Sequence, residues 1–277
     1  MPIDHFQKSI IAVIQKNRSN QSAVAGGSAL HQHGFRLSND IDIFDTSPKS
    51  IQQTALADLT TLEQAGFATT IDANFEGFVR ATVAKSDQGA TRLEWVRYHA
   101  YNYMPFIPDA ELGFRLSYVD LAADKLLAAA TRREPRDYLD LRMFGRITLP
   151  LWNAACAACG KDDAFNPSSL LNAIRRNAHY TNAQLRDGAI LPPQFDPIAF
   201  GAKVHDQLGR ADRALEIIDP HAAGRLTLND AGKPAIHPKE TFSGNFLARP
   251  IHHARRLRAI SRRADSRRAA AFVLFAA

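Results

Sequence analysis

Two acidic residues stand two positions apart in a short apolar segment of this 277-residue chain. Asp40 and Asp42 alternate with Ile41 and Ile43, which is the pattern of a β-strand, so both carboxylates project from one face. Two adjacent carboxylates repel each other unless a cation lies between them, and their oxygens are ligands that Mg²⁺ takes. The alternative is a charged strand end that faces solvent, because Asp-x-Asp is a common sequence.

A glycine-rich turn precedes this predicted strand. Gly26 and Gly27 allow the backbone to approach a ligand closely. Ser28 adds a hydroxyl donor, and backbone amides at the start of a following helix, predicted over 28–33, form an anion pocket. A phosphate cradle followed by a paired carboxylate predicts a site that holds a triphosphate and its metal. A plain tight turn remains the alternative for the glycines taken separately.

The sequence around these residues resembles that of a known family. VAGGSALHQHGFRLSNDIDIF is similar to the first motif of the AbiEii/AbiGii abortive-infection toxins, a branch of the DNA polymerase β-like nucleotidyltransferase superfamily. The second motif of that branch, a helix with lysine followed by an Arg-Asp pair, is matched by DLAADKLLAAATRREPRDYLDL. The resemblance implies that Lys125 assists nucleotide binding and catalysis, and the alternative is a lysine whose ammonium group lies in solvent. It also places Arg136, Asp137 and Asp140 in the site, with roles that the residues themselves do not define.

The superfamily uses a third carboxylate on a neighbouring strand, and the matching segment here is TRLEWV, residues 91–96. Glu94 stands where the family usually has Asp. Glutamate keeps the charge and lengthens the side chain by one methylene, which affects the geometry of one metal and leaves the reaction class unchanged. Asp72, on a preceding predicted strand, is the rival candidate.

The resemblance implies a metal-dependent nucleotidyltransferase that moves an NMP from an NTP to an acceptor hydroxyl. It implies Mg²⁺, as two ions on Asp40, Asp42 and Glu94. It also implies an NTP bound at Gly26, Gly27, Ser28 and Lys125. The implied acceptor is RNA, in particular the 3′ end of tRNA, and the implied partner is an antitoxin protein. Two alternatives stay open: a small-molecule nucleotidyltransferase of the antibiotic-modifying kind, and a non-catalytic relative that binds nucleotide or RNA.

Hydrophobic periodicity predicts the elements that must position these residues. Helices are predicted over 4–16, 48–65, 120–129, 136–144, 167–177 and 197–218, and strands over 22–25, 41–44, 67–71, 78–84 and 91–96. We therefore predict an α/β (α+β) fold in three parts. These are a nucleotidyltransferase core with a mixed sheet flanked by helices at 1–115, a mainly helical region at 116–228, and a linker with an arginine-rich tail at 229–277.

The composition is that of a soluble globular protein, with 45% hydrophobic and 22% charged residues. Two cysteines in so long a chain favour a reducing cytoplasm. Cys156 and Cys159 have the spacing of half a zinc site without the other half, so small core residues on a helix are expected. The N-terminus lacks the features of a signal peptide, and no apolar run is long enough to span a bilayer, so we expect no membrane partner.

The net charge of +6 is concentrated near the C-terminus. Residues 249–268 contain eight arginines and one aspartate, a local charge of +7, which leaves −1 for the rest of the chain. A basic tail suits RNA or another polyanion. The alternatives are a solvated tail without function and a stretch that reflects an altered reading frame near the terminus.

Overall fold

The structure is a computed structural model, and it describes residues 3–30, 36–86, 88–98, 102–145, 149–239 and 247–248. The predicted arginine-rich tail and part of the predicted 28–33 helix lie outside the described residues. The described residues form two compact units, one of residues 3–98 with 105–117 and one of residues 102–104 with 118–248. Each unit is treated separately below.

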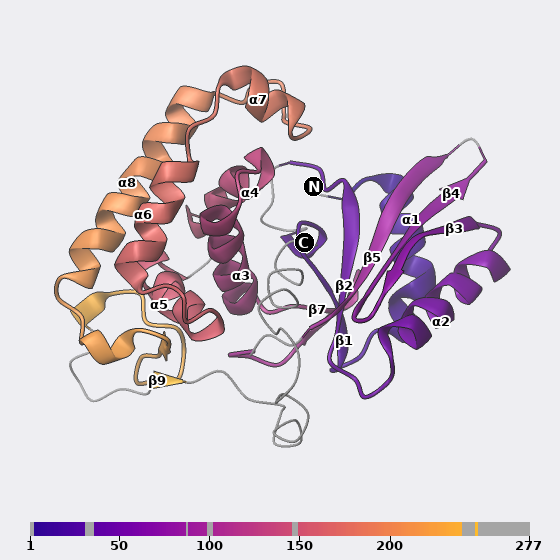
Figure 1. Ribbon diagram of the computed structural model, residues 1–277, viewed down its shortest axis with the longest axis horizontal. Coiled ribbons are helices and arrows are strands. Elements are labelled where there is room, and N and C mark those ends of the chain that lie inside the picture. Colours follow the sequence, from indigo (N-terminus) through magenta and orange to yellow (C-terminus); the bar gives the residue numbers. More distant parts are fainter. Residues whose placement is uncertain are drawn as a thin grey trace. The chain divides into compact units, whose positions relative to one another are not determined.

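The first unit is built on a mixed sheet of seven strands in the order β3-β4-β5-β2-β1-β7-β6 (Figure 1). The strands are β1 (Ser22–Ala25), β2 (Asp40–Asp45), β3 (Ala68–Phe75), β4 (Phe78–Lys85), β5 (Gly89–Arg97), β6 (Ile107–Asp109) and β7 (Gly113–Arg115). Its helices are α1 (His5–Ile14) and α2 (Ile51–Gln64). The pairs β2–β5 and β1–β7 are parallel, and the other pairs are antiparallel.

The two faces of this sheet carry different kinds of side chain, because side chains alternate along each strand. One face packs on α1 and α2, which lie against each other in Figure 1. Ile41, Ile43 and Trp95 belong to the buried hydrophobic core on that face. Their chain neighbours Asp42 and Glu94 therefore project from the opposite face, so the same strands carry core on one side and charge on the other.

The start of α2 corrects one expectation. The helix begins at Ile51, not at Pro48, because Ser50 and Gln53 form a capping box in which each side chain binds the other's backbone amide. A serine cap satisfies an amide at the helix start, which a proline placed earlier does not do. The predicted helix at 4–16 is confirmed as α1, with a similar box between Asp4 and Gln7.

A buried carboxylate on α2 holds β5 in place. Asp58 of α2 is fully buried, and both of its oxygens accept hydrogen bonds from the Arg18 guanidinium, at 2.6 and 2.5 Å. The indole nitrogen of Trp95 donates to the same carboxylate at 2.7 Å. Trp95 directly follows Glu94, so this network fixes the strand that carries the third acidic residue.

The second unit is mainly helical. Its helices are α3 (Tyr118–Thr131), α4 (Pro135–Asp140), α5 (Leu151–Lys161), α6 (Pro167–Asn177), α7 (Asn182–Asp187) and α8 (Pro197–Leu215), and a short ladder joins β8 (Leu226–Thr227) to β9 (Leu247–Ala248). The predicted bounds of α6 are confirmed. The helix predicted over 136–144 is observed as α4 followed by the 3-10 helix η3 (Leu141–Gly145), and Pro135 is the first residue of α4. Proline suits this first position because its missing N–H has no helical partner there. The predicted α/β class with a helical second part is confirmed.

Cys156 and Cys159 lie buried on α5, as expected for small core residues. Burial raises the pKa of each thiol to about 12, so both stay protonated near neutral pH.

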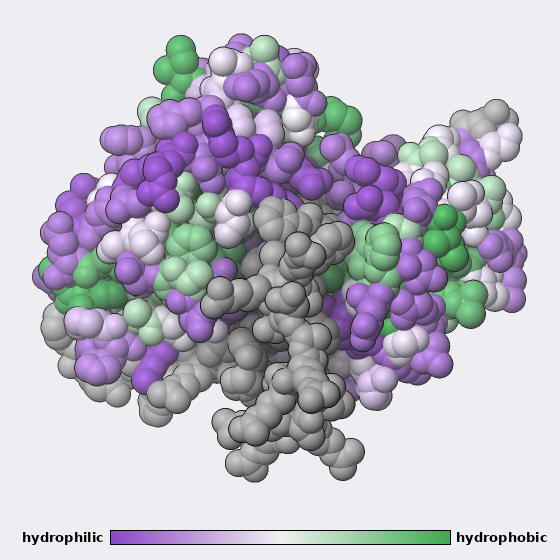
Figure 2. All heavy atoms as spheres, viewed as in Figure 1, coloured by the Kyte–Doolittle hydropathy of each residue, from purple (hydrophilic) through white to green (hydrophobic). Residues whose placement is uncertain are grey.

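The surface drawn in Figure 2 is mainly hydrophilic with scattered hydrophobic patches. Within the described ranges, none of the helices combines the length and the apolar character needed to traverse a membrane.

Candidate active site

The turn after β1 approaches a carboxylate so closely that it requires glycine. Gly26 has φ of 57°, in the left-handed region, and a Cβ built on it would lie 1.6 Å from Oδ2 of Asp42. A Cβ on Gly27 would lie 2.7 Å from the Ser38 hydroxyl oxygen. The two glycines therefore bring the turn directly against the side chains that precede and line β2.

Ser28 has a role that the sequence did not indicate. The residue is fully buried, and its hydroxyl donates to the backbone carbonyl of Asp40 at 2.7 Å. The hydroxyl thus ties the short 3-10 turn η2 (Ser28–Leu30) to the first residue of β2. A phosphate held at this turn would rely mainly on backbone amides, and that interaction stays a prediction.

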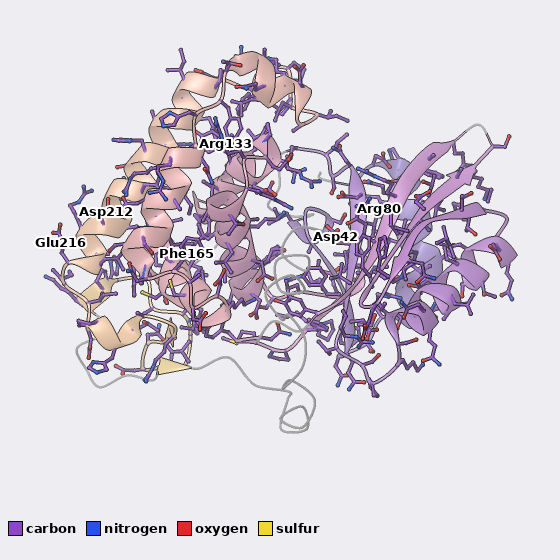
Figure 3. The ribbon with its side chains drawn as sticks, in the orientation of Figure 1. Asp42, Arg80, Arg133, Phe165, Asp212 and Glu216 are labelled. Atoms are coloured by element: carbon purple, nitrogen blue, oxygen red, sulfur yellow. The ribbon has the colours of Figure 1, made fainter. Side chains whose placement is uncertain are left out.

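Three acidic residues lie close together on the face of the sheet opposite the helices. Asp40 and Asp42 share this face of β2, and Glu94 on β5 is the direct register partner of Asp42. All three are buried, with 7%, 1% and 3% of their surfaces exposed. Figure 3 labels Asp42 within the sheet. Packing three acids this closely out of water costs free energy unless positive charge compensates them.

The electrostatics of Glu94 reflect this environment. Burial raises the pKa of its carboxyl group above the usual 4.5, and the nearby charge of Asp40 raises it further. Arg80 and Arg92 oppose this shift without cancelling it. Oε2 of Glu94 is buried and has no hydrogen-bond partner in the described part of the chain. A buried carboxylate oxygen of this kind is suited to a bound cation.

The donor set fits Mg²⁺ in its chemistry. It consists of carboxylate oxygens from two adjacent strands, which are hard ligands. In the described residues, no group of three or more His, Cys, Asp or Glu side chains already has the arrangement of a metal site. Ligation by Asp40, Asp42 and Glu94 therefore stays a prediction that rests on their proximity and on the buried Oε2.

Asp72, the rival third acid, lies elsewhere. It stands on β3, the edge strand, with β4 and β5 between it and β2. The side chain is exposed and accepts a hydrogen bond from the Thr82 hydroxyl at 2.8 Å. The strand order therefore favours Glu94 as the acid beside Asp42.

The residues of the second motif lie in the helical unit. Lys125 of α3 is 5% exposed, so its side chain is not in solvent, and its Nζ lies 2.9 Å from Oδ2 of Asp140. Asp137, fully buried, pairs with Arg132, whose Nε and Nη2 lie 2.5 and 3.0 Å from its two oxygens. Three residues that the motif places in the site, Lys125, Asp137 and Asp140, thus make buried ion pairs. An interaction between Lys125 and a nucleotide stays a prediction, as does a role for Arg136.

Sequence reasoning missed two cations, Arg80 and Arg132. Arg80 is the register partner of Glu94 on β4, and its Nε donates to Oε1 of Glu94 at 2.7 Å. The only available signal was its place in a predicted strand, since its pairing depends on which strands are neighbours. Arg132 lies five residues before Asp137, across a turn that a helical pattern does not predict.

Comparisons with known proteins define the fold. No protein-family model and no curated protein sequence matches this chain. A solved structure of MenT4, a nucleotidyltransferase toxin from Mycobacterium tuberculosis, is 16% identical with a TM-score of 0.57, over 79% of this chain and 85% of that one. A proposed nucleotidyltransferase from H. pylori is 17% identical with a TM-score of 0.48, over 76% of this chain and 95% of that one.

The likeness to MenT4 establishes a nucleotidyltransferase-like fold for this chain. The expected nucleotidyltransferase core is thereby confirmed as a fold. Activity must be argued from the site itself, because one fold can carry different functions.

Proposed function

We propose that this protein is a magnesium-dependent nucleotidyltransferase that moves an NMP from an NTP to an acceptor hydroxyl. One observation carries the proposal: Asp40, Asp42 and Glu94 are buried together on adjacent strands, beside a turn that only glycine can form. A chain without metal chemistry gains no stability from this arrangement. The nucleotidyltransferase-like fold supports the same reading.

The proposed division of labour follows from the positions of the residues. Asp40, Asp42 and Glu94 would hold Mg²⁺, which neutralises phosphate charge and makes an acceptor hydroxyl easier to deprotonate. The backbone amides at Gly27 and Ser28 would orient the β- and γ-phosphates. Following the resemblance, Lys125 is the proposed cation for the triphosphate.

In the proposed reaction, the acceptor oxygen bonds to the α-phosphorus. The bond from that phosphorus to the bridging oxygen breaks, and pyrophosphate leaves on the opposite side. The acceptor hydroxyl gives up its proton in the same process. The protein's main contribution is to align the attacking and leaving oxygens, since alignment alone lowers the barrier substantially.

We further propose a toxin role, with RNA as the acceptor and an antitoxin as the partner. MenT4 is described as a nucleotidyltransferase toxin, which supports the first of these statements by analogy. The 3′ end of tRNA is the acceptor that the sequence resemblance implies. Its terminal ribose offers the free hydroxyl that the reaction needs.

The test is a transfer assay with the purified full-length chain. Each of the four NTPs, labelled at the α-phosphate, is incubated with Mg²⁺ and total tRNA, and products are separated by size. We expect label on tRNA with a preference for one or two NTPs, and none when EDTA replaces Mg²⁺. Label in small products alone would support the small-molecule alternative. Absence of transfer from every NTP, with nucleotide still bound, would support the non-catalytic alternative.

The contribution of the arginine-rich tail can be measured separately. A chain ending at Ala248 removes residues 249–277 and keeps β9, which pairs with β8. If the tail binds RNA, its removal should flatten the log–log dependence of RNA affinity on salt by roughly 0.7 for each phosphate that the tail neutralises. NTP binding should be unchanged. An unchanged salt slope would contradict an RNA-binding role for the tail.

A further inference from the structure

Among the described residues, Arg80 is the hydrogen-bond partner of the Glu94 side chain. The two residues are register partners on β4 and β5, and the Arg80 Nε donates to Oε1 at 2.7 Å. The Arg80 side chain is 36% exposed and that of Glu94 is 3% exposed. Figure 3 labels Arg80 in the same sheet as Asp42. A hydrogen bond between two ionised groups is stronger and more directional than a neutral one.

Arg80 is itself held in place. Its guanidinium carbon lies 5.3 Å from the ring centroid of Phe78, two residues away on the same face of β4. Phe78 is 7% exposed, so the ring is a fixed surface. The guanidinium therefore has a defined position from which to orient Glu94.

The two oxygens of Glu94 differ. Oε1 accepts from Arg80, whereas Oε2 is buried and has no hydrogen-bond partner among the residues that the structure describes. A buried oxygen without a partner lowers stability, so its persistence calls for an explanation in a ligand. The row Asp42–Glu94–Arg80 across the sheet places the acids next to each other and the cation on the outer side.

We propose that Arg80 is a positioning residue, which holds Oε1 of Glu94 so that Oε2 alone serves the metal. Glutamate has one more rotatable side-chain bond than Asp42, so it needs a restraint that the shorter acid does not. Arg80 supplies this restraint from the strand next to β5. The inference rests on the proposed metal-dependent function, and it adds a residue that acts through Glu94 without touching the reacting atoms.

Arg92 offers a matched control. It stands two residues from Glu94 on the same face of β5, opposite Asp40 in the register of β2 and β5, and it is exposed. Arg92 influences Glu94 through its charge. Arg80→Gln removes one positive charge and the directed hydrogen bond, whereas Arg92→Gln removes one positive charge near the same carboxylate. Comparing the two separates orientation from charge.

The experiment measures Mn²⁺ binding to the full-length chain by electron paramagnetic resonance, without nucleotide or RNA. Arg80→Gln should weaken Mn²⁺ binding by about 10–100-fold, as is usual when a residue that orients a metal ligand is removed. Arg80→Lys should be weakened nearly as much, because lysine restores the charge without the side-on Nε donor. Arg92→Gln should bind Mn²⁺ within about threefold of the unmodified chain, since screened surface charges act weakly.

Transfer kinetics give a second readout. Arg80→Gln should lower kcat and raise the Mg²⁺ concentration needed for half-maximal rate, with the KM for NTP nearly unchanged. Three results would each overturn the proposal. Arg80→Gln could bind Mn²⁺ as tightly as the unmodified chain, Arg80→Lys could regain full Mn²⁺ affinity, or Arg92→Gln could lose as much Mn²⁺ affinity as Arg80→Gln. Circular dichroism during heating checks that all variants are folded. If the unmodified chain transfers NMP while Arg80→Gln matches it, the inference fails and the proposed function stands; if the unmodified chain neither binds Mn²⁺ nor transfers, the proposed function fails.

Discussion

The acidic cluster on the sheet and the buried acids of the helical unit differ in how their charges are compensated. On the sheet, Asp40, Asp42 and Glu94 are packed side by side, with Arg80 at one end of the row. In the helical unit, each of three buried acids lies beside a cation: Asp140 beside Lys125, Asp137 beside Arg132, and Asp120 beside Lys161.

Under the proposed function, the difference separates charges that stabilise the fold from charges that bind a metal ion. A matched buried pair is costly to break, because removal of one partner leaves the other uncompensated. A cluster of like charges destabilises the chain that carries it, and it can persist where a bound cation repays the cost. The comparison therefore predicts opposite results for mutations in the two regions, in activity and in stability.

The largest effect is expected on the sheet. Asp42→Asn, which keeps the shape beside Gly26, should lower NMP transfer by about 1,000-fold or more, equivalent to ~4 kcal/mol of transition-state stabilisation. Its melting temperature without metal should be unchanged or higher, because one member of a like-charge cluster is removed. Labelled-NTP transfer and thermal denaturation measure the two quantities. Transfer at the unmodified rate by Asp42→Asn would rule out the mechanism.

Mg²⁺ sharpens this prediction. A ligand that binds only the folded state raises stability by mass action. Mg²⁺ should therefore raise the melting temperature of the unmodified chain and have little effect on Asp42→Asn. An equal rise in both proteins would place the ion away from Asp42.

The second effect is expected in the helical unit, at Lys161. Its Nζ lies 3.1 Å from Asp120 Oδ1 and 2.8 Å from Asp124 Oδ1, and the lysine side chain is 1% exposed. Burial by itself would lower the pKa of Lys161, but the two aspartates reverse this and raise it. The stabilisation is therefore fully present at neutral pH and is lost only as the pH rises through the folded-state pKa, above 10.5.

Lys161→Met should lower the free energy of unfolding by about 3–5 kcal/mol, because Asp120 stays buried without its cation. Asp120 also accepts hydrogen bonds from the backbone amides of Tyr103 and Met104, so it cannot easily turn away. Urea denaturation measures the loss, and adding Asp120→Asn to the same chain should recover part of it. A loss below about 1 kcal/mol would show that the pair is not a stabilising element of this unit.

The smallest effect concerns pH and Glu94. Because the folded-state pKa of Glu94 is raised, the folded chain binds its proton more tightly than the unfolded chain does. Stability in EDTA should therefore fall as the pH rises from 4.5 through the folded-state pKa, and the penalty should persist above it. Glu94→Gln removes this penalty and can still accept from Arg80. Melting temperatures from pH 4 to 8 should fall less steeply for Glu94→Gln than for the unmodified chain. Parallel curves would contradict the inference that the buried acidic cluster destabilises the metal-free protein.

Several features followed from the sequence because their causes are local. The alternation of Ile41 and Ile43 with Asp40 and Asp42 predicted a strand with both acids on one face, and β2 has that form. The helix predicted over 167–177 is observed as α6 with the same bounds, and Pro167 stands in its first turn, where proline is favoured. The resemblance also indicated the nucleotidyltransferase-like fold that the likeness to MenT4 supports. Strands β6 and β7 escaped prediction, since three residues are too few to show a period.

Partners distant in the sequence were decided by the tertiary structure. Periodicity states that Glu94 lies on a strand, but only the parallel register of β5 with β2 places it beside Asp42. Two other interactions likewise depend on chain segments that meet only in the folded protein. These are the hydrogen bond from the Ser28 hydroxyl to the Asp40 carbonyl and the ion pair between Lys125 and Asp140. Side-chain direction follows from neighbours along the chain, whereas strand order and register follow from packing the whole core. For this reason the sequence by itself determined which residues could do chemistry, and the fold decided that Arg80 faces Glu94.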